Sequence, residues 1–150
     1  MRVEFTPGSL FKVLVREDGH AYALMLSVFP YVAFYGENVS MEEAGFPSEA
    51  PMFIIVVART AYASGGWGSP LRRLAEEFLP AIPRFFWQSP VKKSECKIVE
   101  PIKRRVAAAP GECVGLEPEA VWSQEHIEAR IIDTYAGRPN AFLESLRVRL

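Results

Sequence analysis

The sequence contains few metal-binding or disulfide-forming residues. Among its 150 residues are two cysteines, Cys96 and Cys113, and two histidines, His20 and His126. No C-x-x-C or H-x-x-x-H spacing occurs, so we expect no metal and no other cofactor. The cysteine count leaves a disulfide open, although reduced thiols are favoured in the cytoplasm.

Long apolar runs are also missing. The longest, over residues 52–58, falls far short of the roughly 18 residues that a membrane-spanning helix needs. The first residues show no apolar stretch followed by a small-residue cleavage site, as a signal peptide would have. We therefore expect a cytoplasmic protein with no membrane partner.

Neither sign of charge dominates. Lys and Arg number 17 and Asp and Glu 18, which argues against a strongly basic nucleic-acid-binding domain. The charge is nevertheless unevenly divided along the chain. Residues 61–110 hold nine basic and four acidic side chains, whereas residues 1–60 and 111–150 each hold four basic and seven acidic. This division predicts one basic region with acidic flanks.

Catalytic motifs are absent from the sequence. There is no G-x-S-x-G elbow, P-loop or G-x-G-x-x-G. Ser123, His126 and Asp133 fall within one predicted helical region, but Ser123 is better interpreted as its N-cap. The adjacent carboxylates Glu76 and Glu77 would not face each other on a helix. The sequence therefore predicts no enzyme, no catalytic residue and no small-molecule substrate.

Alternating and apolar segments predict strands in the first two-thirds of the chain. Runs rich in β-branched and aromatic residues cover 10–15, 21–28, 32–35, 52–58 and 96–99. Asp18-Gly19 indicates a hairpin between the first two runs. The proline-framed segment 84–88 is expected to be extended, and Trp67, within a glycine-rich connection, is expected in the core.

Helices are predicted mainly near the end of the chain. Ser123 as N-cap and Gly137 as C-terminal stop delimit the best helix, and 140–146 favours a short second one. An apolar stripe over 71–79 predicts a further short helix. These segments predict one α+β domain over residues 1–150. We expect a curved, mostly antiparallel, barrel-like sheet with a C-terminal α-helix packed on it.

Three blocks of the sequence resemble one known family. The first is Pro7-Gly8-Ser9-Leu10-Phe11 followed by the hairpin from Asp18 to Ala23. The second is Gly66-Trp67-Gly68 with Pro70-Leu71, followed by Pro83-Arg84-Phe85-Phe86-Trp87-Gln88. The third runs from Glu112-Cys113-Val114-Gly115-Leu116-Glu117 through Ala120-Val121-Trp122-Ser123, His126-Ile127-Glu128 and Arg130 to Gly137-Arg138-Pro139-Asn140. In order and spacing these blocks resemble the immunity protein 26 family of bacterial polymorphic toxin systems.

The resemblance implies a non-catalytic protein that binds and neutralises a cognate toxin. It implies structural roles for the shared residues: glycines in turns, tryptophans in the core and the arginine paired with a carboxylate. These residues are Trp67, Phe85, Phe86, Gly115, Leu116, Trp122, His126 and Arg130. Toxin contacts are then expected on exposed loops.

Two surfaces are candidates for the toxin contact. If the toxin presents a cationic cleft, the contact is the acidic set Glu37, Glu42, Glu43 and Glu49. If the toxin is acidic, the contact is the basic set Lys92, Lys93, Lys97, Lys103, Arg104 and Arg105. An alternative interpretation is a small adaptor or regulatory module that binds nucleic acid or protein through the basic set. Nucleic acid is the less favoured partner, because the whole chain is slightly acidic.

Overall fold

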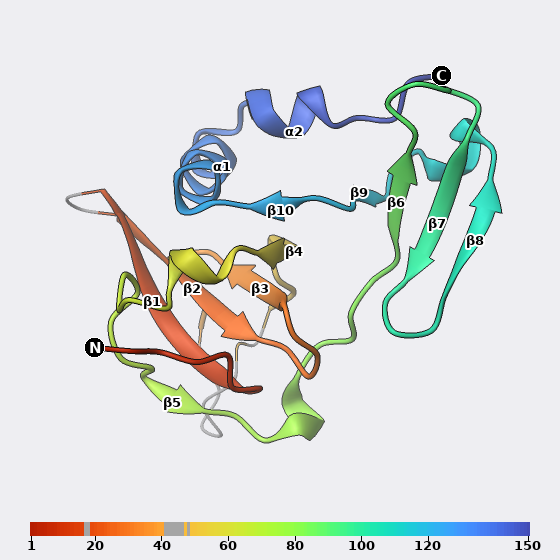
Figure 1. Cartoon of the computed structure of the whole chain (residues 1–150). Coiled ribbons are helices and arrows are strands. Elements are labelled where there is room, and N and C mark those ends of the chain that lie inside the picture. The colour runs from red at the N-terminus through yellow and green to blue at the C-terminus, as the bar shows by residue number, and fades with distance from the viewer. Residues whose placement is uncertain (17–18, 41–46, 48) are drawn as a thin grey trace.

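Two β-sheets and a C-terminal helical segment make up the protein (Figure 1). The computed structural model describes residues 1–16, 19–40, 47 and 49–150. One sheet has six strands and the other has four. They lie side by side, and the helices run along the top in the view of Figure 1. Among the described residues, no helix combines the length and apolarity needed to cross a bilayer.

The six-stranded sheet, called here the large sheet, is built around a meander of four strands. Its order is β10-β4-β3-β2-β1-β5, and only the β10–β4 pair is parallel. The bounds are Ser9–Arg16 for β1, Gly19–Met25 for β2, Tyr31–Tyr35 for β3, Phe53–Val57 for β4, Arg72–Arg73 for β5 and Val121–Trp122 for β10. A 3₁₀ helix, η1 (Arg59–Ala61), follows β4.

Each face of the large sheet carries a cluster of buried side chains. Along β1 the side chains of Phe11, Val13 and Val15 alternate with exposed ones, so a single face enters the main core. That core also takes Ile127 and Ile131 from the helix above it. A second cluster on the opposite face is formed by Leu10, Leu24, Leu26, Ala33, Tyr35 and Leu74. Burial there raises the pKa of Tyr35 to about 12.

The helical segment confirms the sequence prediction closely. Helix α1 spans Gln124–Ala136, with Ser123 as N-cap accepting from the backbone N–H of His126 at 3.4 Å. Gly137 ends it with a φ of 67°, the left-handed conformation that favours glycine. Helix α2 spans Ala141–Ser145, inside the predicted 140–146 range.

The four-stranded sheet, called here the small sheet, has the order β8-β7-β6-β9. Its strands are β6 (Phe85–Gln88), β7 (Cys96–Glu100), β8 (Arg104–Ala108) and β9 (Glu117–Pro118), and only β6–β9 is parallel. The sequence predicted β6 and β7 but missed β8. A 3₁₀ helix, η3 (Pro110–Cys113), connects β8 toward β9.

The prediction for 71–79 was wrong. This segment forms β5 and a 3₁₀ helix, η2 (Glu76–Phe78). Its backbone pairs with the edge of β1 instead: the N–H of Leu74 donates to the carbonyl of Gly8 at 2.8 Å. Gly8 has a φ of +89°, and a Cβ there would lie 2.2 Å from the Leu74 carbonyl oxygen, so the close approach requires glycine.

The predicted fold class, α+β with a curved, mostly antiparallel sheet and a C-terminal helix, is confirmed. The barrel-like element of that prediction is not found. The strands belong to two separate sheets, because β6–β8 pair among themselves and not with the N-terminal strands.

Candidate protein-binding surface

Both tryptophans of the resemblance lie in the core of the large sheet. Trp67 is 4% exposed, and its Nε1–H donates to Oε1 of Gln124 at 2.8 Å. Trp122 is fully buried, and the ring of Phe142 packs edge-on against it, with the ring centroids 4.9 Å apart. These side chains stabilise the fold and are not available to a partner.

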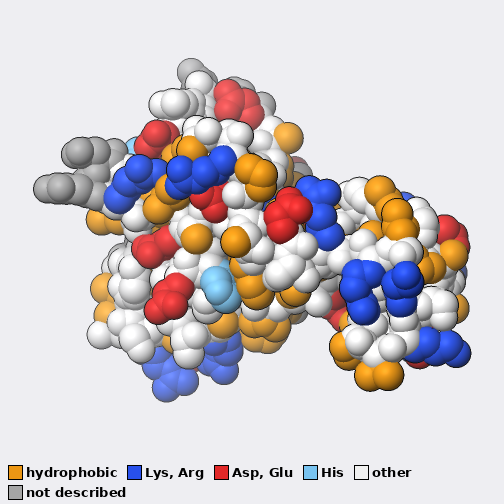
Figure 2. Space-filling view, turned by 90° about the horizontal axis from the view of Figure 1, so that it is seen from above, with side chains coloured by type: hydrophobic (Ala, Val, Ile, Leu, Met, Phe, Trp, Pro, Cys, Tyr) orange, Lys and Arg blue, Asp and Glu red, His pale blue; other side chains and the backbone are white. Residues whose placement is uncertain are grey.

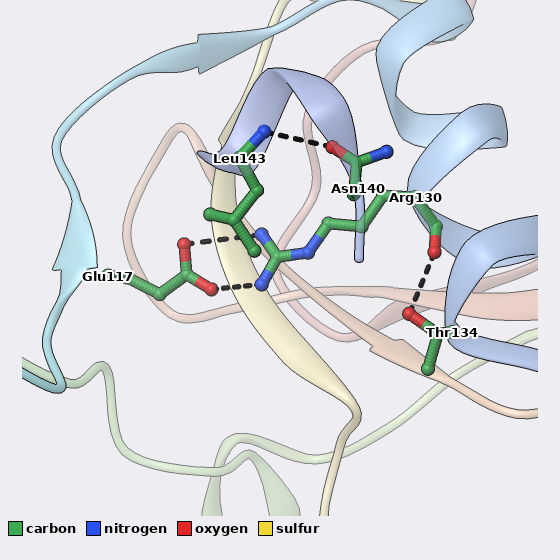
Figure 3. Close-up of polar contacts among 5 residues, drawn as sticks. All are labelled: Glu117, Arg130, Thr134, Asn140 and Leu143. Carbon is green, nitrogen blue, oxygen red and sulfur yellow. Dashed lines mark hydrogen bonds and ion pairs between the residues drawn. The ribbon is translucent and has the colours of Figure 1, made fainter. Parts of the chain in front are cut away.

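Arg130 and Glu117 form a buried ion pair (Figure 3). Nη1 of Arg130 donates to Oε2 of Glu117 at 3.2 Å, and Nη2 donates to Oε1. The guanidinium also lies 4.1 Å from the ring centroid of Phe53 and 4.9 Å from that of Trp122. Because Glu117 belongs to β9 and Arg130 to α1, the pair ties the small sheet to the helix on the large sheet. The expected arginine–carboxylate pairing is confirmed.

The other shared residues divide between the two sheets. The ring of Phe85 packs against Tyr31 of β3, with the two ring centroids 5.5 Å apart. Phe86 instead packs in the small sheet's cluster with Cys96 and Cys113. The imidazole of His126 stacks on the ring of Phe142, with the ring centroids 3.8 Å apart. Gly115 has a φ of +87° in the turn before Leu116, as the expected turn role requires.

The acidic set comes together only in part. Glu37 and Glu49 line a shallow hollow of about 310 Å³ beside Tyr135. The hydroxyl of Tyr135 accepts from the backbone N–H of Glu37 at 2.9 Å and donates to the carbonyl of His20 at 2.6 Å. Glu42 and Glu43 lie outside the described residues.

The basic set does not form one patch. Lys92 and Lys93 lie in the turn before β7 and Lys103 in the turn after it, at opposite ends of a strand about 17 Å long. Arg105 makes a bidentate pair with Glu119, at 2.7 and 3.0 Å. Arg104 pairs with Glu100 at 3.4 Å. Lys97 alone of the set meets an aromatic ring, with its Nζ 5.8 Å from the ring centroid of Trp87.

A groove on the small sheet was not predicted from the sequence. It has a volume of about 380 Å³. Residues from β6, η3, β9 and the C-terminal end line it: Phe86, Cys113, Val114, Gly115, Leu116, Glu117, Pro118, Leu143, Arg147, Val148 and Leu150. We call it the tail groove. Only tertiary packing brings residues 86, 113–118 and 143–150 together, so no local sequence pattern could have revealed it.

The last residues of the chain are tied across the small sheet. The amide of Gln88 pairs with the backbone of Arg149 in both directions, each hydrogen bond being 2.8 Å. The guanidinium of Arg149 also donates to the carbonyl of Ser89 at 2.5 Å. Val148 is thereby held against the cluster of Phe86, Cys96 and Cys113.

The two cysteines are free thiols, which answers the question that the sequence left open. Both are buried in the small cluster beneath the tail. Burial raises the pKa of the Cys113 thiol, and Cys96 raises it further, so Cys113 is a weakly reactive packing residue. Within the described part of the chain, no group of three or more His, Cys, Asp or Glu side chains is placed to hold a metal ion.

Exposed apolar side chains accompany the basic ones on the small sheet and its connections. Val91, Ile102, Val106, Val114 and Leu150 are all exposed, the last two at the tail groove. We call the small sheet and its connections the small lobe. Figure 2 shows basic and hydrophobic side chains gathered on this lobe, at the right of the view. Residues 84–119 and 143–150 hold nine basic and six acidic side chains, and the rest of the chain holds eight and twelve. The small sheet and the segments that line the groove therefore carry an excess of positive charge.

Comparisons with protein-family models, with curated proteins and with solved structures gave no match to this chain. They lend no support to the resemblance to the immunity protein 26 family.

Proposed function

We propose that this protein binds a cognate bacterial toxin and neutralises it by protein–protein inhibition, without a catalytic step of its own. The toxin component of the proposal comes from the family resemblance of the three sequence blocks. The binding component rests on one observation: the small sheet carries exposed apolar side chains, a groove and an excess of positive charge on the same lobe.

These features match what an inhibitory interface needs. Stable complexes bury about 1,600 Å² in total and draw most of their energy from a few anchors seated in pockets. The tail groove is a pocket of that kind, and the apolar side chains around it supply desolvated area. The surrounding positive charge would speed association with an acidic surface. This combination favours the basic side of the molecule over the acidic set as the toxin contact.

Growth rescue tests the proposal directly. The chain is co-expressed with each toxin domain encoded beside its gene, and survival is scored. We expect one toxin to be suppressed and to co-purify with the protein. Soluble expression without rescue from any of these toxins would contradict the proposal.

A second candidate function rests on Trp87 and Lys97. The half-buried indole with a lysine 5.8 Å from its centroid could stack a base and hold its phosphate, as in adaptors that bind single strands. Titration of a fluorescent oligothymidine at two salt concentrations decides this. Binding that weakens steeply with salt and is lost in Trp87→Ala would favour the adaptor function. The absence of such binding would rule out the adaptor function.

A further inference from the structure

The tail groove is lined mainly by apolar side chains. Phe86 and Cys113 form its buried part, Leu116, Leu143 and Val148 are half-buried, and Val114 and Leu150 are 59% and 73% exposed. Its volume of about 380 Å³ lies near the lower end of the roughly 300–1,000 Å³ typical of ligand sites. A groove of this volume has room for one large side chain of a partner. Val148 of the chain itself already packs an aliphatic side chain beside this space.

The charges at the groove favour an anion. Two charged residues line it, Glu117 and Arg147. Both carboxylate oxygens of Glu117 are held by Arg130, so Glu117 offers little to a cation. Nε of Arg147 lies 2.8 Å from Oε2 of Glu144, but the side chains of Arg147 and Glu144 are 70% and 42% exposed. Such an exposed pair contributes little and is readily exchanged for a ligand carboxylate.

The wider surface supports the same preference. Residues 84–119 and 143–150, which include every segment that lines the groove, carry nine basic against six acidic side chains. Four of those six carboxylates are already paired with arginines of the chain: Glu100, Glu117, Glu119 and Glu144. A partner segment that approaches the groove therefore meets a positive field with few competing carboxylates.

We infer that the tail groove is the anchor site for the toxin, and that it takes a large apolar side chain flanked by a carboxylate that binds Arg147. The inference rests on the proposed function and adds to it the contact surface and the chemistry of the partner: an acidic segment with one aromatic or leucine-like anchor. The apolar side chain displaces water from between Leu116, Leu143 and Val148. The neighbouring carboxylate replaces Glu144 at the guanidinium of Arg147.

Short peptides test the groove without the toxin. The full chain is titrated with three probes, Asp-Glu-Phe-Asp-Glu, Asp-Glu-Ala-Asp-Glu and Lys-Lys-Phe-Lys-Lys, and backbone NMR shifts are followed. We expect the first peptide alone to shift the amides of residues 113–117 and 143–150. If it shifts no groove amide at millimolar concentration, or if all three peptides act alike, the inference fails.

Paired variants test the groove in the complex. Arg147→Glu and Lys103→Glu change the net charge equally, and Lys103 lies exposed in the β7–β8 turn of the same lobe, outside the groove. We expect Arg147→Glu to weaken binding of the acidic phenylalanine peptide at least about tenfold and to abolish rescue, with Lys103→Glu changing binding less than about threefold. Equal effects of the two variants would reduce the site to general electrostatics and overturn the inference.

The outcomes separate the two proposals. If the wild type rescues growth and Arg147→Glu rescues equally well, the groove assignment fails and toxin neutralisation stands. Loss of rescue in Glu49→Lys, with rescue intact in Arg147→Glu, would move the contact to the acidic set. If no toxin is neutralised, the proposed function fails, and the peptide titration still decides what the groove binds. Concentration-dependent dimerisation blocked by Val114→Asp would make a second copy the occupant and overturn the inference.

Discussion

The two sheets of this protein are built in different ways. The large sheet carries a buried cluster on each face, and among the described residues its main cluster contains aromatic side chains from strands, loops and helix, including Phe11, Phe34 and Trp122. The cluster of the small sheet buries only Phe86, Cys96 and Cys113, under a short 3₁₀ helix and the chain's last residues. One strand of the small sheet, β8, is exposed along most of its length. The large sheet therefore carries the stability, and the small sheet leaves surface for a partner.

The largest expected effect is the loss of a buried aromatic side chain from the large sheet. Phe34→Ala should lower the free energy of unfolding by about 3–5 kcal/mol, because it opens an enclosed cavity. Phe86→Ala in the small sheet should cost at least about 1 kcal/mol less, because Phe86 borders an open groove where a smaller enclosed cavity forms. Urea unfolding of both variants checks this. Equal losses would mean that the two clusters are equally well packed.

The second largest expected loss of stability comes from breaking the Arg130–Glu117 ion pair that links the two sheets. Arg130→Met leaves the carboxylate of Glu117 buried without its partner. The loss should be about 3 kcal/mol, at the low end for a broken buried pair, because the Glu117 side chain is 19% exposed. Arg104→Met removes an exposed pair within the small sheet and serves as the control, with a loss below about 1 kcal/mol. If the thermal unfolding midpoints of the two variants coincide, Arg130 does not tie the sheets together.

Release of the tail should affect the small sheet alone. Gln88→Ala removes three hydrogen bonds with Arg149 and one with the carbonyl of Lys93. Their loss should cost about 1–2 kcal/mol of local stability, because these groups are exposed to water. Faster alkylation of Cys113 should result, since this thiol is fully buried beneath the tail. Gln124→Ala, which removes the bond to Trp67 on the large sheet, should leave alkylation unchanged. Protection of Cys113 in Gln88→Ala would show that the tail does not cover it.

The smallest expected effect is the pH dependence of the stability that Asp133 provides at the junction between α1 and α2. Hydrogen bonds from Arg138, at 2.6 Å, and Asn140, at 2.9 Å, lower the pKa of Asp133 in the folded protein. A lowered folded pKa gives stabilisation that is present above the unfolded pKa, about 3.9, and is lost as the pH falls through the folded value. The stability advantage of the wild type over Asp133→Asn should therefore be constant at neutral pH and shrink below about pH 4. An advantage independent of pH down to 2.5 would contradict this assignment.

The elements that local chemistry determines were predictable. The alternation in 10–15 and the caps Ser123 and Gly137 act within a few residues of themselves. Asp18 of the predicted hairpin turn lies outside the described residues. The apolar stripe over 71–79 also fits a helix, but the free edge of β1 next to Gly8 captures its backbone instead. Strand β8 was missed because its arginines and alanines are weak strand formers, and pairing with β7 determines its conformation.

The candidate site was less predictable than the fold. The basic set was visible as a run in the sequence, yet the structure separates Lys92 from Lys103 by the length of a strand and pairs Arg105 with Glu119. The tail groove combines three distant segments, and the residues that make it useful, such as Leu116 and Arg147, carry no local signature of binding. Sites of this kind depend on tertiary packing, which spacing alone does not encode.

Native-state hydrogen exchange of the full chain tests the central claim most directly. The free energies of opening for amides in β2 and β3 are compared with those in β7 and β8. We predict that β7 and β8 exchange through a partial opening at least about 2 kcal/mol below the global unfolding that exposes β2 and β3. Exchange of all four strands at the same free energy would show one cooperative unit and would contradict the division between a stable sheet and a binding sheet.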